Sequence, residues 1–133
     1  MAEYVNPAFA LLMAAALCAI TAAIHSVLGE QRLVRPLLAS DAPLMQSALF
    51  RNVTRFAWHW TTVLWLCVAA VLAMAAYGDI DAPVLLLAIG AAHLVMGVAD
   101  AFLTRGRHIG WPLITLIGVL TLLAYFAQAA TTI

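Results

Sequence analysis

The stretch that decides the fold is residues 56–103, FAWHWTTVLWLCVAAVLAMAAYGDIDAPVLLLAIGAAHLVMGVADAFL. It holds two apolar runs, Phe56 to Tyr77 and Pro83 to Leu103, separated only by residues 78–82. Each run is about 20 residues long, which suits an α-helix that crosses a hydrocarbon core of roughly 30 Å. Gly78 follows the first run, where a left-handed C-cap is expected, and Pro83 suits a first helical turn. A connection this short predicts an antiparallel helical hairpin.

Two further apolar runs flank this hairpin, which makes four in all. Hydrophobic residues make up 66% of the chain and charged residues 9%, and a soluble domain needs more charge than that to stay dissolved. The sequence therefore predicts an all-α polytopic membrane protein, a four-helix bundle with antiparallel up-down order. We expect residues 1–133 to form a single integral membrane domain with spans at about 8–28, 56–77, 83–103 and 110–129.

The basic residues predict the orientation in the membrane. All six are arginines, and they occur only in the connections 29–55 and 104–109: Arg32, Arg35, Arg51, Arg55, Arg105 and Arg107. Short connections rich in Arg or Lys stay in the cytoplasm. We therefore expect an inner (cytoplasmic) membrane protein whose termini both lie on the periplasmic or extracellular side. The net charge of zero gives no indication of a nucleic-acid partner.

The connection 29–55 contains a helical pattern of its own. Apolar Met45, Leu49, Val53 and Phe56 recur every three or four residues, while the arginines fall on another face. Such spacing is typical of an amphipathic helix. We expect this helix to begin near Ala42, as a cytoplasmic extension that continues without a break into the second span.

Four ionisable residues lie inside the predicted spans: His25, His59, His93 and Asp100. Such groups are costly in lipid and usually face the bundle interior or water. Distances from the span ends place His25, His59 and Asp100 at nearly one level, close to the cytoplasm. His93 should lie roughly 10 Å deeper, on the same helical face as Asp100. Gly90 and Gly97 share that face, which predicts close approach of a neighbouring helix.

These residues suggest a site that holds a ligand. His25 and His59 could supply two axial ligands to haem b, with Arg51 and Arg55 near its propionates. His25, His59, His93 and Asp100 are also candidate ligands for a transition metal ion. A third interpretation leaves out the metal, so that His93 and Asp100 carry protons or hold the head group of a quinone or lipid.

A purely structural interpretation accounts for the same residues. His25 would form a hydrogen bond with a carbonyl group of a neighbouring helix, and His59, between two tryptophans, would belong to an aromatic belt. Asp100 would pair with Arg105 or Arg55. The two cysteines, Cys18 and Cys67, lie near the middle of their spans, and we expect both to be small packing residues with free thiols.

Three functions follow from these alternatives. The first is binding of a His-ligated cofactor, with a role in electron or proton transfer, and the layout is similar in outline to membrane b-type cytochromes. The second is a non-catalytic accessory or assembly subunit of a larger membrane complex. Transport of a small solute or proton through a homo-oligomer is weaker, since Leu11 to Ile20 lacks a carboxylate in the middle of the first span.

Overall fold

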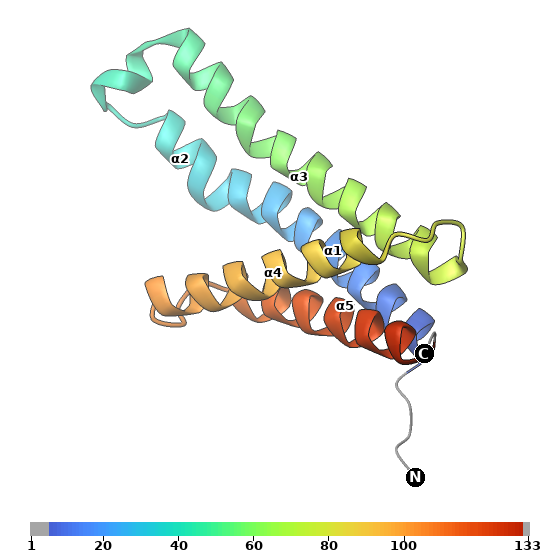
Figure 1. Cartoon of the computed structure of the whole chain (residues 1–133). Helices are drawn as coiled ribbons and strands as arrows, with labels where there is room; N and C mark the ends of the chain where they lie inside the picture. The colour runs from blue at the N-terminus through green and yellow to red at the C-terminus, as the bar shows by residue number, and fades with distance from the viewer. Residues whose placement is uncertain (1–5, 132–133) are drawn as a thin grey trace.

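The computed structural model describes residues 6–131, and within that range the chain is helical and contains no strand. Four long helices account for most of it, with three short helical segments between the first two long ones (Figure 1). In chain order the elements are α1 (Pro7–Gly29), the π-helical η1 (Glu30–Val34), α2 (Arg35–Leu38), the 3-10 helix η2 (Pro43–Gln46), α3 (Ala48–Tyr77), α4 (Pro83–Leu103) and α5 (Trp111–Thr131).

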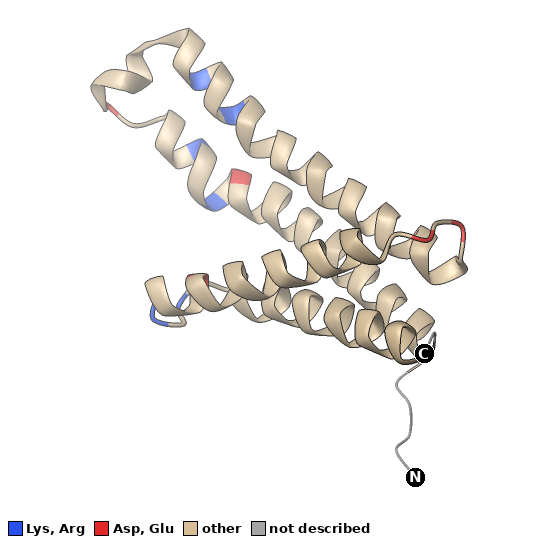
Figure 2. Ribbon diagram, in the orientation of Figure 1, with Lys and Arg blue, Asp and Glu red and all other residues tan. Residues whose placement is uncertain are grey.

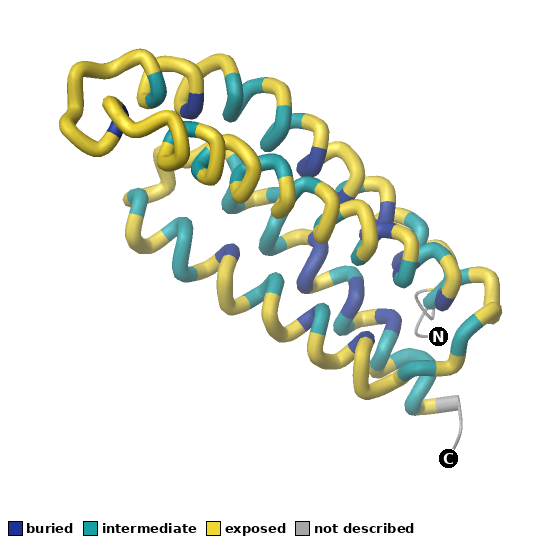
Figure 3. The backbone as a smooth tube through the Cα atoms, turned by 90° about the horizontal axis from the view of Figure 1, so that it is seen from above, coloured by how far each residue is buried: buried dark blue, intermediate teal, exposed yellow. Residues whose placement is uncertain are grey.

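Four helical stretches are long and apolar enough to cross a membrane: Pro7–Leu38, Ala48–Tyr77, Pro83–Leu103 and Trp111–Ala130. Their outward faces carry many large exposed apolar side chains, among them Phe9, Val84, Val95 and Phe126. Figure 3 shows exposed residues along all four helices, with buried ones gathered on the facing sides. Such a surface suits contact with lipid better than contact with water.

The helices are arranged as two pairs that diverge. α1 packs against α3 and against α5, and α4 packs against α5. In Figure 1 the α1–α3 pair and the α4–α5 pair lie close together where α1 begins, and they separate toward the opposite pole. That opposite pole carries the arginines of both pairs (Figure 2).

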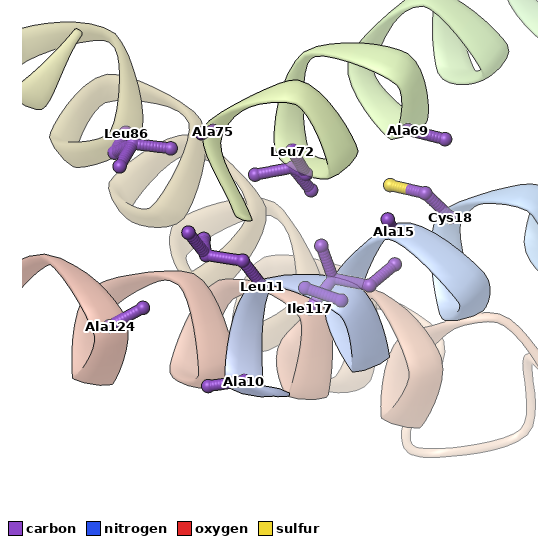
Figure 4. Packing of buried hydrophobic residues seen from close by; sticks show 11 residues of the cluster. Ala10, Leu11, Ala15, Cys18, Ala69, Leu72, Ala75, Leu86, Ile117 and Ala124 are labelled. Carbon is purple, nitrogen blue, oxygen red and sulfur yellow. The ribbon is translucent and has the colours of Figure 1, made fainter. Parts of the chain in front are cut away.

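The apolar core lies at the pole where the two pairs meet. Leu11, Leu72 and Ile117 are fully buried there, and Cys18 and the small residues of α1 pack among them (Figure 4). Many core positions are alanines, which lets the helices approach closely. The core thus holds the pairs together at one end and leaves the arginine-bearing ends without a common core.

Glycines allow α4 and α5 to pack closely. A Cβ atom on Gly97 would lie 2.6 Å from the backbone nitrogen of Thr115, and one on Gly118 would lie 2.4 Å from that of Leu94. Gly90 and Gly97 are both buried. The expected close approach of a helix on the face of Gly90 and Gly97 is therefore confirmed.

The predicted helix ends on both sides of the connection 78–82 are also confirmed, although α3 and α4 scarcely pack against each other as the predicted hairpin would. α3 ends at Tyr77, and Gly78 adopts φ 78° as its left-handed C-cap. α4 begins at Pro83 as expected. At the start of α1, the Asn6 side chain accepts a 3.2 Å hydrogen bond from the Phe9 backbone N–H, and Pro7 occupies the first turn.

The predicted start of the second long helix, near Ala42, is wrong. Residues 43–46 form a 3-10 turn, and Ser47 has extended backbone angles. The Ser47 hydroxyl accepts a hydrogen bond from the Phe50 backbone N–H, so α3 begins at Ala48. Because Ser47 satisfies a first-turn donor, the chain turns there instead of continuing one helix back to Ala42.

The first long helix continues past Leu28, where the predicted first span ends. The chain does not enter a loop after Leu28 but remains helical to Leu38, through the single π-helical turn of η1. At about 1.5 Å per residue, the 32 residues of Pro7–Leu38 span about 48 Å, against about 31 Å for α4. The α1–α3 pair therefore extends well past the α4–α5 pair.

Candidate functional site

His25 lies at the interface of α1 and α3 and is tightly held. Its ring stacks on Trp58, with centroids 4.2 Å apart and an interplanar angle of 10°. Its Nε2 lies 2.9 Å from the Thr61 hydroxyl oxygen and 3.3 Å from the Trp58 carbonyl oxygen. The Thr61 hydroxyl donates to that same carbonyl, so Nε2 carries the proton and donates to both oxygens. The expected contact with a neighbouring carbonyl is confirmed.

His59 reaches back from α3 to α1 in the same layer. Its Nδ1 lies 2.9 Å from the Ser26 hydroxyl, and its Nε2 lies 3.4 Å from Glu30 Oε2. Glu30 Oε1 in turn pairs with Arg55 at 2.9 Å. His25 and His59 thus lie at one level, as expected, but each contacts groups of the opposite helix. Their joint role as axial ligands stays a prediction.

The two arginines expected near the haem propionates, Arg51 and Arg55, bind other groups of the protein near the arginine-bearing end of the α1–α3 pair. Arg55 binds Glu30, and Arg51 donates a 2.6 Å hydrogen bond to the carbonyl oxygen of Met45. Arg51 thereby fastens the 3-10 segment onto the start of α3. Both contacts connect α3 to the segments beside it, and anchoring of propionates by these arginines stays a prediction.

His93 and Asp100 lie on α4, on the side of the gap between the helix pairs. His93 Nδ1 donates a 2.8 Å hydrogen bond to the Ile89 carbonyl oxygen, and its ring makes an edge contact with Trp65 of α3. Asp100 Oδ2 lies 2.6 Å from Nδ1 of His108. Pairing of Asp100 with Arg105 or Arg55 is therefore wrong: Arg55 binds Glu30, and His108 takes the carboxylate.

The connection between α4 and α5 carries His108 back to Asp100. Arg105 and Gly106 both adopt left-handed backbone angles, with φ 53° and 72°. The Trp111 indole N–H donates to the Gly106 carbonyl oxygen at 3.2 Å, which holds the turn against the start of α5. This double left-handed turn reverses the chain and places the imidazole of His108 beside a carboxylate eight residues earlier.

Two cavities open between the diverging helix pairs. The first, here called the His93 cavity, has a volume of about 480 Å³ and is lined by Trp65, His93, Met96, Asp100, His108 and Ile114, among others. The second, here called the arginine cavity, has a volume of about 490 Å³, and its walls include His25, Gly29, Arg32, Trp58, Arg107 and His108. His108 lines both cavities, so they adjoin at its ring.

The predicted ligands are therefore divided among different places. His59 lies between α1 and α3, His25 borders the arginine cavity, and His93 and Asp100 border the His93 cavity. In residues 6–131, no three histidine, cysteine, aspartate or glutamate side chains are close enough together to hold a metal ion. A metal site built from all four residues stays a prediction.

Four residues of these cavities were missing from the predicted site: Trp58, His108, Arg32 and Arg107. One signal for His108 was present in the sequence, since Gly106 allows a tight turn between it and Asp100. Nothing in the local sequence distinguishes Arg32 and Arg107 from the other four arginines. Their position on one cavity depends on how the two helix pairs meet.

Comparison of the chain with protein-family models, with curated proteins and with solved structures finds no match.

Proposed function

We propose that this protein crosses the inner membrane four times as an antiparallel up-down bundle and binds haem b in the His93 cavity. His93 and His108 are the candidate iron ligands, and Asp100 orients His108. The four long apolar helices support the four crossings. The arginine-rich pole supports an orientation with both termini outside and with the cavity near the cytoplasmic face.

The hydrogen-bond partners of the two imidazoles are the observation that carries this proposal. His93 Nδ1 donates to a carbonyl oxygen, and His108 Nδ1 donates to the Asp100 carboxylate. In the neutral ring, each therefore keeps its lone pair on Nε2. Histidines that bind metals characteristically donate their other ring N–H to a carbonyl or a carboxylate, which fixes the ring and strengthens the ligand. Both rings border one cavity.

The walls of the cavity suit a flat apolar ring. Trp65, Met96 and Ile114 contribute apolar surface, and the volume of about 480 Å³ falls within the range of ligand pockets. Haem b takes one or two axial ligands from the protein, which matches the number of histidines on this cavity. A bound haem would suit the protein to electron transfer.

Haem uptake by purified protein tests this proposal. The chain is purified in detergent and titrated with haemin, and the absorption spectrum is recorded before and after reduction. We expect one haem per chain with the spectrum of a b-type haem. His93→Ala and His108→Ala should each weaken binding, and the double variant should abolish it. His59→Ala is the matched control, because that ring contacts Ser26 and Glu30 outside the cavity.

Three results would count against the proposal. A chain that takes up no haemin overturns it. If His25→Ala and His59→Ala lose haem binding and His93→Ala keeps it, the iron ligands are His25 and His59, the pair predicted from their common level in the membrane. Metal content without haem points to the bare metal ion instead.

One observation favours the accessory-subunit function as a second candidate. The end of the α1–α3 pair carries several large apolar side chains that are exposed: Leu44, Leu49, Val53 and Phe56. An exposed apolar patch of this kind often marks a protein or membrane contact. A partner that co-purifies in fixed stoichiometry, and that is lost in the Leu49→Ser/Val53→Ser variant, would support this function.

A further inference from the structure

The arginine cavity brings two cations together from different parts of the chain. Arg32 comes from η1, which continues α1, and Arg107 comes from the connection between α4 and α5. The cavity lies where the two helix pairs have separated, so the two arginines come from opposite sides of the gap. No other cavity described in residues 6–131 is lined by an arginine.

Neither arginine is neutralised by the protein. In the described range, the ion pairs are Arg55 with Glu30, His59 with Glu30, and His108 with Asp100. The side chains of Arg32 and Arg107 make no ion pair or hydrogen bond with any residue of that range, although the Arg107 backbone N–H donates to the Thr104 carbonyl oxygen. Like charges on one cavity repel each other, although water screens this repulsion because both arginines are exposed. An anion between the two groups would turn this repulsion into attraction.

The remaining walls of the cavity are apolar. Leu28, Leu33 and Ile109 line it. Trp58 forms a flat wall that is held in place, since it stacks on His25 and its indole N–H donates to the His25 carbonyl oxygen at 3.1 Å. Gly29 makes room for this wall, because a Cβ atom there would lie 2.4 Å from Trp58 Cζ2. The cavity therefore combines a cationic pair with fixed apolar surface.

We propose that the arginine cavity is a binding site for an anionic phospholipid, whose phosphate lies between Arg32 and Arg107 and whose acyl chain packs against Trp58, Leu28 and Ile109. Guanidinium groups match phosphate oxygens in charge and in paired hydrogen-bond geometry. Basic pockets between helices on the cytoplasmic side are suited to such head groups. This site does not depend on haem, although His108 borders both cavities.

Native mass spectrometry of the full chain tests the lipid site. The protein is released from mixed micelles that contain phosphatidylglycerol or phosphatidylcholine, and bound lipids are counted. We expect one retained phosphatidylglycerol and a clear preference over phosphatidylcholine. Arg32→Gln/Arg107→Gln should lower that preference about 25-fold, since each basic residue near an anionic lipid contributes about a factor of five. Competition with inorganic phosphate measures how much the head group contributes to affinity, and competition with oleate measures how much the acyl chain contributes.

The matched control is Arg35→Gln/Arg105→Gln. It removes the same charge from the same pole at residues that line none of the described cavities. Equal losses in the two double variants would mean general attraction to a charged pole and would overturn the site. Unchanged lipid retention with weaker haemin binding in Arg32→Gln/Arg107→Gln would overturn it too, and would assign both arginines to the propionates of haem. A colourless protein that still selects phosphatidylglycerol through Arg32 and Arg107 keeps the lipid site and removes the haem proposal alone.

Discussion

The imidazole of His108 and the carboxylate of Asp100 are joined by a 2.6 Å hydrogen bond from Nδ1 to Oδ2. The bond closes the connection between α4 and α5, and it lies where the His93 cavity and the arginine cavity adjoin. About a fifth of the Asp100 side chain is exposed, so the carboxylate is largely shielded from water. An imidazole held by a shielded carboxylate keeps a defined orientation, as a ligand to a cofactor requires.

Asp100→Asn should weaken haemin binding without unfolding the protein. The carboxamide keeps the shape of the side chain but loses the charge that strengthens His108 as a ligand, so we expect a loss of affinity of about 10- to 100-fold. Haemin titration followed by absorption measures it. Asp79→Asn is the control, since Asp79 is exposed in the turn between α3 and α4. Equal affinity in Asp100→Asn and the wild type would contradict the role given to Asp100.

Gly97→Ala should loosen the packing of α4 on α5. The added methyl group would lie 2.6 Å from the Thr115 backbone nitrogen and 2.9 Å from its Cα, and backbone atoms cannot rotate away. We expect a cost of about 1–3 kcal/mol in the free energy of unfolding. Thermal unfolding in detergent, followed by circular dichroism, measures the change. The exposed neighbour Val98→Ala should leave the midpoint nearly unchanged, and similar midpoints for Gly97→Ala and the wild type would argue against this packing.

The two thiols should react very differently with a maleimide. Cys18 is fully buried in the core at the pole where the two helix pairs meet, whereas Cys67 is exposed on α3. Cys67 lies in mid-span on a face that would contact detergent, so we expect the folded protein to take up at most one maleimide per chain, slowly and at Cys67, and the protein denatured in dodecyl sulfate to take up two. Mass spectrometry of Cys18→Ser and Cys67→Ser identifies the reactive thiol. Rapid labelling of Cys18 in the folded chain would show that the α1–α3 interface is open there.

Fusions at the C-terminus should report a periplasmic end. The arginines at one pole predict that this pole stays in the cytoplasm, which places both termini outside when the number of crossings is even. Alkaline phosphatase fused after residue 133 should therefore be active, and green fluorescent protein at the same place should stay dark. A fusion within the Arg105–Arg107 turn should behave in the opposite way. The reverse pattern would invert the proposed orientation.

Several elements could be predicted because local chemistry determines them. The connection 78–82 follows from Gly78, which accepts a left-handed conformation, and from Pro83, which suits only a first helical turn. The start of α3 was misplaced because the apolar spacing from Met45 to Phe56 continues across Ser47. The capping hydrogen bond of Ser47 outweighs that periodicity, and spacing alone does not reveal it.

The partners of the ionisable residues could not be predicted in the same way. The positions of His25 and His59 along their helices correctly predict that both lie at one level. They do not predict the orientation of either ring. Trp58 fits over Gly29 and stacks on His25, so that ring is committed to the α1–α3 interface. His108 lies outside the spans, and only the two left-handed residues before it bring it to Asp100.

Length, hydropathy and the placement of arginine, glycine and proline are enough to establish four membrane-length helices and a chain whose positive charge lies at one pole, because these properties act over one or a few helical turns. The divergence of the two helix pairs depends on something else. Alanines and glycines allow close packing at the pole where the pairs meet, and the longer α1–α3 pair then separates from α4 and α5. That separation, a product of contacts between residues distant in the chain, creates the two cavities and selects which histidines and arginines face them.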